Sequence, residues 1–470
     1  MTTFWNEKGQ IVPNRLYTFL AENGFGKYFP DGTTVKNANP IIVKVNNNLV
    51  SEVNVGYLLE FVRSYIERYF ENGGDSGAVL DSLHKSTSLF GEKNLKLLNT
   101  RKLDFITDTK RSGYFFFKNG IVEVKADGFS LLNYSDINGY IWESSIKEYD
   151  FKTVDFETLK RNCDYLNFVR DLSRVPNAEH TEKRFASLQS IIGYLLHRYK
   201  DGTQNQAVIL MDVFVDGKPN GGSGKSLLIN SIGKLRKLAV IDGKSYDQKE
   251  WFSLSSVALD SELILFDDVK ANFDFEQIFA LLSTGLFLRR KHKDNIHIPH
   301  ERSPKIALTT NYAINGDSSS HERRKIEYEV SSTYSAAFTP RDKFGRNFFD
   351  EWDEKDWMMF YNTMFYFLSF YLANGLVRSE PINIKTTKFV NVTSEEFAEF
   401  VAHELCLDHR FDKKELYGSF LTEYPEFKNK HTQREFTTWL REWAKFKDYD
   451  IAEPRSDSTR YVIFSAKSTS

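Results

Sequence analysis

The chain has few cysteines and few prolines for its length of 470 residues. Its two cysteines, Cys163 and Cys406, stand far apart and form no CxxC pair. That pattern excludes a disulfide framework and a cysteine-rich zinc site, and it predicts a reducing, intracellular setting. The 11 prolines and 26 glycines, beside 41% hydrophobic residues, exclude a fibrous or largely disordered chain. This length exceeds what one hydrophobic core supports, so about two to four domains are expected.

The chain also lacks an excess of positive charge and a long apolar run. Its 62 basic and 64 acidic residues give a net charge of −2, so any DNA contact must be local. The first ten residues include Glu7 and Lys8 and have no apolar core, unlike a signal peptide. The most apolar stretch, residues 357–373, contains polar residues and is short for a membrane span, which favours a buried helix. We therefore expect a cytoplasmic protein with no membrane partner.

The residue pattern divides the chain into successive domains. Residues 1–153 hold short alternating runs broken by turn signals, as in a mixed α+β domain, and show no recognisable chemistry. Residues 154–205 carry apolar positions at helical spacing, which predicts a helical collar. In residues 206–377, continuous apolar runs alternate with helical stretches and predict an α/β domain with a largely parallel sheet. We expect a linker at 378–391 and a small domain at 392–470.

The small C-terminal domain is predicted to be a winged helix. Thr393 and Thr432 are each followed three residues later by a glutamate, the capping box that opens a helix. A further apolar-periodic stretch lies between them, and two alternating runs follow around a turn at 454–458. Its last helix carries three basic residues, Arg434, Arg441 and Lys445. These residues suit contacts to DNA, while a solvated face or a docked protein stays open.

The strongest chemical signal is a glycine-rich loop between the apolar run at 207–215 and a helical run at 227–235. The loop reads Asn220, Gly221, Gly222, Ser223, Gly224, Lys225, Ser226 and Leu227. Backbone N–H groups of such a loop cradle phosphates, while Lys225 neutralises the β and γ oxygens and Ser226 ligates Mg²⁺. Pro219 replaces the first glycine of the usual spacing. The loop predicts ATP and Mg²⁺ as cofactors.

Two later apolar runs end in polar residues that suit nucleotide hydrolysis. Asp267 and Asp268 follow the run at 263–266, where one carboxylate would hold Mg²⁺ and the other would orient the attacking water. Either assignment of these two roles stays open. Asn311 follows the run at 306–308 and would contact the γ-phosphate or the attacking water. Taken singly, each residue also fits an ordinary turn, so their order behind the loop favours the functional interpretation.

Two basic clusters accompany these motifs. A run at 289–293 reads Arg-Arg-Lys-His-Lys, and Arg323 and Arg324 precede an alternating run at 325–330. An arginine at the start of an edge-like strand can reach the nucleotide of a neighbouring subunit and stabilise transition-state charge, which requires a ring. Taken alone, both clusters also fit a solvated or ion-paired surface.

In this order and spacing, the motifs resemble those of the superfamily 3 helicases of small DNA viruses, poxviruses and phages. Residues 154–470 are similar to the helicase part of phage and poxvirus primase-helicases. The resemblance implies an AAA+-like P-loop core whose catalytic residues are Lys225, Asp267, Asp268, Asn311 and Arg324. It implies that Ser226 and Asp267 bind the metal. It further implies that Lys291, His292 and Lys293 form the tip of a hairpin that tracks DNA phosphates.

The resemblance implies a homo-hexameric ATPase ring that pulls single-stranded DNA through a central channel during phage or mobile-element replication. Residues 1–153 show no primase signature, so a separate primase or initiation protein is an expected partner. We expect the first domain to dock DNA or to support assembly. Two other classes stay open: a P-loop regulatory ATPase whose winged helix binds DNA or protein without unwinding, and an RNA-remodelling helicase.

Overall fold

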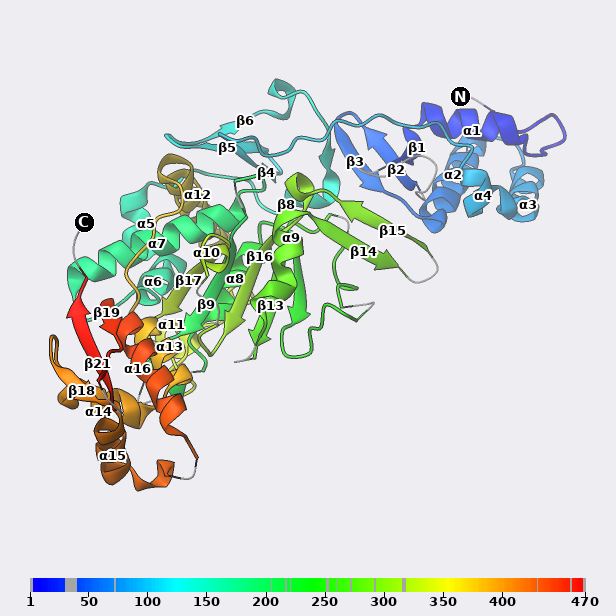
Figure 1. The fold of residues 1–470 in the computed structure, drawn as a ribbon. Coiled ribbons are helices and arrows are strands. Elements are labelled where there is room, and N and C mark those ends of the chain that lie inside the picture. The colour runs from blue at the N-terminus through cyan, green and yellow to red at the C-terminus, as the bar shows by residue number, and fades with distance from the viewer. Residues whose placement is uncertain are drawn as a thin grey trace.

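The computed structural model covers most of the chain from residue 3 to residue 467. The described residues have gaps at 30–39, 72, 204, 216–217, 220, 251–252, 259, 271–272, 291–292, 315–317, 429 and 457–458, and the side chains of 214–215, 218–219, 289–290 and 293–296 also fall outside the description. Figure 1 shows an N-terminal unit at one end, a central sheet, and a C-terminal unit at the other end.

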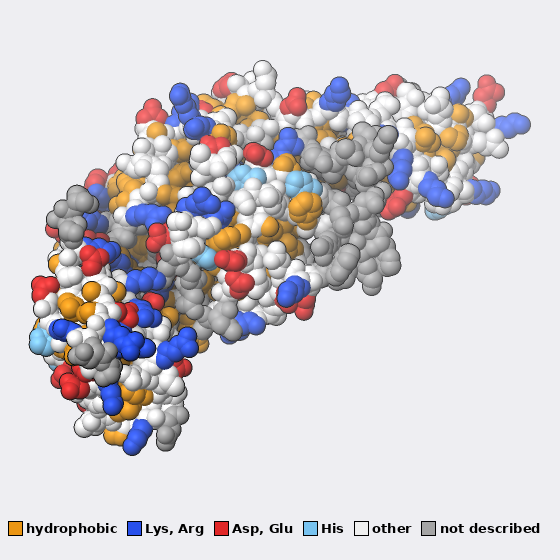
Figure 2. All heavy atoms as spheres, in the orientation of Figure 1, with side chains coloured by type: hydrophobic (Ala, Val, Ile, Leu, Met, Phe, Trp, Pro, Cys, Tyr) orange, Lys and Arg blue, Asp and Glu red, His pale blue; other side chains and the backbone are white. Residues whose placement is uncertain are grey.

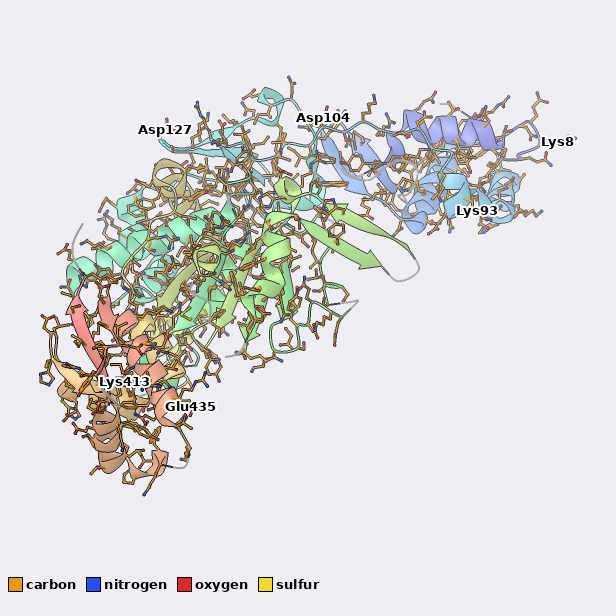
Figure 3. All side chains as sticks on the ribbon, in the orientation of Figure 1. Lys8, Lys93, Asp104, Asp127, Lys413 and Glu435 are labelled. Atoms are coloured by element: carbon orange, nitrogen blue, oxygen red, sulfur yellow. The ribbon has the colours of Figure 1, made fainter. Side chains whose placement is uncertain are left out.

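The N-terminal unit pairs a sheet of order β1-β2-β3-β7 with a group of helices. Helix α2 buries Leu58, Val62 and Ile66, which lie four residues apart on one face, and the Asn54 side chain caps its first turn. Figure 3 labels Lys8 and Lys93, which mark this end of the molecule. The elements are α1 (Pro13–Glu22), β1 (Phe25–Tyr28), β2 (Ile41–Asn46), β3 (Leu49–Glu52), α2 (Val55–Phe70), α3 (Gly77–Lys85), α4 (Glu92–Leu95) and β7 (Ile141–Trp142).

A second sheet, of order β6-β5-β4-β8, packs into the same hydrophobic core as the helices and the central sheet that follow it in the chain. Its strands are β4 (Gly113–Phe117), β5 (Gly120–Lys125), β6 (Gly128–Leu132) and β8 (Ile146–Lys147). The ring of Phe115 lies 4.7 Å from that of Phe365, on helix α12 (Glu354–Asn374). One apolar cluster joins this sheet, α12 and a face of the central sheet. The hydrophobic core therefore crosses the predicted domain boundary at residue 153.

Helices α5 (Phe156–Asn162), α6 (Asp164–Asp171) and α7 (Ala178–Leu196) occupy the predicted collar. Helix α7 packs against α12, so that two helices far apart in the chain share one apolar cluster. Most of α12 is buried, which confirms the predicted buried helix at 357–373. Among the described residues, no helix is long and apolar enough to cross a membrane.

The central sheet has the order β12-β13-β16-β9-β17, and each neighbouring pair is parallel, as predicted. Strands β9 and β16 are buried along their whole length because the sheet is covered on both faces. The strands are β9 (Ala207–Asp212), β12 (Leu238–Asp242), β13 (Leu263–Val269), β16 (Lys305–Thr310) and β17 (Lys325–Val330). As expected from its alternation, β17 is an edge strand.

Shorter elements surround this sheet and complete its connections. Two hairpins are formed by β10 (Phe214–Val215) with β11 (Lys218–Pro219) and by β14 (Leu286–Arg290) with β15 (Lys293–Ile298). The hairpin β14–β15 extends away from the sheet in Figure 1. The helices are α8 (Lys225–Gly233), α9 (Phe279–Ser283), α10 (Ser319–Glu322) and α11 (Pro340–Phe344).

The first residues of the C-terminal unit differ from the prediction in two places. The expected linker at 378–391 is wrong in its second half, where α13 (Ile384–Val392) packs Phe389 against Phe446 with ring centroids 4.7 Å apart. The predicted capping box at Thr393 is also wrong, because Ser394 caps the helix. The capping box at Thr432 is confirmed. The remaining elements are α14 (Glu395–Glu404), β18 (Arg410–Asp412), α15 (Lys413–Glu423), α16 (Gln433–Lys447), β19 (Tyr449–Ala452), β20 (Arg455–Ser456) and β21 (Thr459–Ala466).

A buried histidine at the end of α7 makes the stability of the fold depend on pH. The Nε2–H group of His197 donates to the carbonyl of Thr109 at 2.8 Å, and its Nδ1 atom has no hydrogen-bond partner among the described residues. Burial lowers the pKa of His197 to about 4. The unfolded chain therefore binds a proton near pH 6.5 that the folded chain does not bind until near pH 4.

We expect the free energy of unfolding to fall by up to about 3 kcal/mol between pH 6.5 and pH 4 through this one group. The variant His197→Gln keeps an amide donor for Thr109 but cannot titrate. Urea unfolding of both proteins at pH 7, 5.5 and 4.5 measures the effect as the difference between them. An equal loss of stability in the variant would contradict the assignment.

Candidate functional site

The glycine-rich loop lies between β11 and α8, at the carboxyl end of β9. Gly222 and Gly224 have φ of +83° and +95°, in the left-handed region that favours glycine. Gly224 is the N-cap of α8, so the helix begins at Lys225, as a phosphate-binding loop requires. Leu227 follows in the first turn and packs against the core. Gly221 is exposed, and Asn220 falls outside the described residues.

Lys225 is buried beneath the loop and joins side chains from two neighbouring strands. Only 7% of its surface is exposed. Its Nζ atom donates to Oδ1 of Asp212 at 2.5 Å, to Oγ of Ser223 at 3.2 Å and to Oδ1 of Asn311 at 3.1 Å. Strands β9 and β16 are adjacent and parallel, so the residues at their carboxyl ends meet at one edge of the sheet. The structure thus brings together the predicted residues Lys225 and Asn311.

Asp212 is a site residue that the sequence interpretation missed. It ends β9, is 3% exposed and also accepts a hydrogen bond from the Ser223 hydroxyl. Its Oδ2 atom is buried without a hydrogen-bond partner among the described residues. A buried carboxylate requires a counter-charge, and Lys225 supplies it here. The available signal was an aspartate inside the otherwise apolar run at 207–215.

A bulge at the end of β13 turns the two neighbouring aspartates in different directions. The register between β13 and β16 shifts between Phe266 and Val269. Asp268 takes a left-handed conformation, with φ of +57°. Asp267 therefore faces the loop and accepts a hydrogen bond from the Ser226 hydroxyl at 2.8 Å, whereas Asp268 forms an ion pair with Lys244 at 2.5 Å.

The residues around Asp267 have the chemistry that a nucleotide-bound Mg²⁺ requires. The hydroxyls of Ser226 and Thr309 both donate to Oδ1 of Asp267, at 2.8 and 2.5 Å. The side-chain atoms of Ser226, Thr309 and Asp267 that meet here are all oxygens, the ligand atoms that Mg²⁺ prefers. A nucleotide-bound Mg²⁺ commonly takes one or two carboxylates beside phosphate and water. Among the described residues, no group of three or more His, Cys, Asp or Glu could hold a metal alone. The arrangement fits a metal that arrives with phosphates.

Arg324 lies at the amino-terminal ends of the parallel strands, whereas the glycine-rich loop of the same chain lies at their carboxyl-terminal ends. Its carbonyl accepts the N–H of Ala207, the first residue of β9, at 2.8 Å. Since the loop follows the other end of this six-residue strand, Arg324 and Lys225 are separated by about one strand length, roughly 20 Å. The Arg324 guanidinium lies 4.7 Å over the Phe279 ring, and its Nη1 donates to the Ser320 carbonyl at 3.0 Å. Arg323 is exposed.

The predicted basic tip falls on the hairpin β14–β15, between Arg290 and Lys293. Lys291 and His292 lie outside the described residues, as does the side chain of Lys293. Their predicted contacts therefore stay a prediction. The described strands on either side, β14 and β15, pair antiparallel up to Arg290 and Lys293.

Comparison with known proteins yields similarities of structure only. No family model matches the chain, and no curated protein matches its sequence. The solved apo A form of the NrS-1 C-terminal region is similar at 15% identity and a TM-score of 0.39, covering 96% of this chain and 99% of that chain. Two structures of JCV helicase, one with a bound small molecule, are similar at 13% and 12% identity, with TM-scores of 0.26 and 0.25, over 44% of this chain and 53% of theirs. Similarities with TM-scores this low assign no function to the chain.

Proposed function

We propose that this chain is a Mg²⁺-dependent ATPase of the superfamily 3 helicase type that moves DNA. The observation that carries the proposal is the meeting of Lys225, Asn311 and the Ser226–Asp267 pair at one edge of a parallel sheet. A phosphate-binding loop alone fits many proteins. A lysine at the start of α8, an oxygen-only metal site shared by α8 and β13, and an amide at the end of β16 together suit cleavage of a phosphoanhydride.

Each residue at this edge has a role in the proposed reaction. The N–H groups of Gly222 to Ser226 and the Lys225 ammonium would hold the phosphates. Ser226 and Asp267 would hold Mg²⁺, which would supply positive charge against the developing negative charge. Asn311 contacts the γ-phosphate or the attacking water. Asp268 orients that water once its own ion pair with Lys244 has broken. Asp212 keeps Lys225 in place until phosphate competes for its charge.

The proposed working form is a homo-hexameric ring. The position of Arg324 supports a ring. Arg324 lies at the amino-terminal ends of the strands, too far from the glycine-rich loop of its own chain, so it would contact the nucleotide of a neighbouring copy. Its contacts with Phe279 and Ser320 fix the guanidinium, which favours Arg324 over the exposed Arg323 as the finger. In such a ring, the hairpins β14–β15 would present Lys291, His292 and Lys293 to single-stranded DNA in the channel. A separate primase or initiation protein is the expected partner.

The C-terminal unit is proposed to be a winged helix that docks duplex DNA. Its order of α14, β18, α15, α16, β19 and β21, with an antiparallel sheet, supports this. Figure 2 shows several Lys and Arg side chains on the visible face of this unit. Arg441 forms an ion pair with Glu453 at 2.6 Å, so the exposed Arg434 and Arg460 are better placed for phosphates. A regulatory ATPase that reads DNA through this unit is the second candidate.

ATP hydrolysis by the purified chain tests the two candidates. We expect Mg²⁺-dependent turnover that single-stranded DNA stimulates more than duplex DNA or RNA, because a channel lined by basic hairpin tips binds single strands. The control Lys225→Ala should remove turnover under every condition. Hydrolysis that no nucleic acid changes would contradict translocation and favour the regulatory ATPase. Turnover retained by Lys225→Ala would contradict the site itself.

A further inference from the structure

A tight turn at residues 335–338 lies directly against the glycine-rich loop. A Cβ atom built on Gly222 would be 3.0 Å from the backbone nitrogen of Ala336 and 3.1 Å from the carbonyl carbon of Ser335. The turn is closed by Ser335 and Phe338, whose backbone groups exchange hydrogen bonds of 2.9 and 3.3 Å. The Ser335 hydroxyl accepts the Ala337 N–H at 3.2 Å. The turn therefore contacts the loop through its backbone and has a closed, internally bonded shape.

The turn is anchored to the collar through one buried aspartate. The hydroxyl of Tyr334, which is fully buried, donates to Oδ2 of Asp171 at 2.5 Å, and Lys343 pairs with the same carboxylate. The hydroxyls of Ser331 and Thr333 donate to the backbone carbonyl of Asp171 at 2.6 and 3.0 Å. Because both sides of the turn are tied to one residue of α6, its position beside the loop is set by the folded core.

This rigid turn presents an exposed aromatic ring. Phe338 is 44% exposed, and the inner side of its ring stacks on Tyr334 with centroids 6.2 Å apart and planes 20° apart. A single exposed apolar side chain is ordinary on a protein surface. Phe338 differs because it is four residues beyond buried Tyr334, on a turn that touches the phosphate-binding loop. Its exposed ring surface therefore lies two residues from the backbone that touches Gly222.

We propose that Phe338 stacks on the purine base of the nucleotide whose phosphates bind the glycine-rich loop. The inference rests on the proposed function, because it requires a nucleotide at that loop. Base–aromatic stacking depends on the face of the ring and not on its hydrogen-bonding edge, so it strengthens binding without selecting strongly between adenine and guanine. Phe338 is accordingly a binding residue for the base, while Lys225 and Ser226 bind the phosphates.

Calorimetric titration of the full chain with Mg²⁺-ATP and with Mg²⁺-tripolyphosphate separates base binding from phosphate binding. We expect Phe338→Ala to weaken ATP binding on the order of 10-fold and to leave tripolyphosphate binding unchanged. The variant Phe338→Trp should restore ATP affinity, because it restores a stacking surface. The matched control is Tyr57→Ala, which removes a comparably exposed ring, 46%, from α2 in the N-terminal unit and should bind both ligands normally.

Other outcomes would overturn the proposal in distinguishable ways. Unchanged ATP affinity in Phe338→Ala would exclude base stacking, and unchanged affinity with altered assembly in size-exclusion chromatography would assign the ring to an interface between copies. Equal weakening of both ligands would assign the turn to support of the loop. A wild-type chain that binds neither ligand would overturn the nucleotide site, and the stacking with it.

Discussion

The variant Arg324→Ala is expected to lower ATP turnover about 10³-fold while ATP affinity stays close to that of the wild type. Arg324 lies at the amino edge of β17, roughly 20 Å from Lys225 of the same chain, so its loss leaves the phosphate contacts of that chain intact. The expected loss is that of the charge which, in the proposed ring, the guanidinium provides for the transition state at a neighbouring subunit. Turnover and calorimetric ATP binding, measured on the same preparation, check both parts.

Two controls make this result specific to a cross-subunit arginine. Arg323→Ala removes the adjacent, exposed arginine and should leave turnover near the wild-type value. Mixing Arg324→Ala with Lys225→Ala chains should restore part of the activity, because each Lys225→Ala chain can offer its Arg324 to an intact loop next to it. Two inactive variants that stay inactive when mixed would contradict a finger acting in trans. If Arg323→Ala loses activity and Arg324→Ala does not, Arg323 would be the arginine finger in place of Arg324.

The sequence predicted the parts of the site that follow from local order along the chain. A continuous apolar run indicates a strand buried on both faces, and the carboxyl ends of adjacent parallel strands must share an edge. Lys225 and Asn311 therefore come together in the structure as their positions after two such runs suggest. The alternation after Arg324 likewise predicted an edge strand, which β17 is.

What the sequence could not predict depends on contacts between residues far apart in the chain. Asp212 looks like a polar interruption of a strand until the fold brings Lys225 to it. The second sheet joins the central core because Phe115 meets Phe365, 250 residues later, and no local pattern reports such a pairing. Pro381 and the two threonines that follow favour a linker, whereas the contact of Phe389 with Phe446 holds this segment as helix α13.

The bulge in β13 is a further feature that no local pattern reports, and it turns two neighbouring aspartates toward different partners. Asp267 lies against the hydroxyls of Ser226 and Thr309, where it can hold Mg²⁺. Asp268 has φ of +57° and turns toward Lys244. A one-residue change of direction thus separates the proposed metal ligand, Asp267, from Asp268, which we propose orients the attacking water.

Substitutions of the two aspartates should therefore change different properties, the Mg²⁺ dependence of ATP binding at 267 and turnover at 268. We expect Asp267→Asn to weaken the Mg²⁺ dependence of ATP binding and to lower turnover at least about 100-fold, since even indirect metal contacts change metal affinity ~10–100-fold. Asp268→Asn should keep Mg²⁺-dependent binding and lose turnover by about 10²–10⁴-fold, the usual contribution of a general base. Asparagine is the substitution of choice at 268 because it tolerates the left-handed conformation.

Magnesium titrations of ATP binding and of turnover distinguish these two outcomes. The matched control is Asp242→Asn, because Asp242 ends β12 beside Asp267 in register but faces neither the loop nor Ser226 in any contact of the described residues. It should bind Mg²⁺-ATP and hydrolyse it normally. Loss of the Mg²⁺ response in Asp268→Asn, with a normal response in Asp267→Asn, would reverse the assignment. That reversal would mean that Asp267 leaves Ser226 and Asp268 leaves Lys244 when the nucleotide binds.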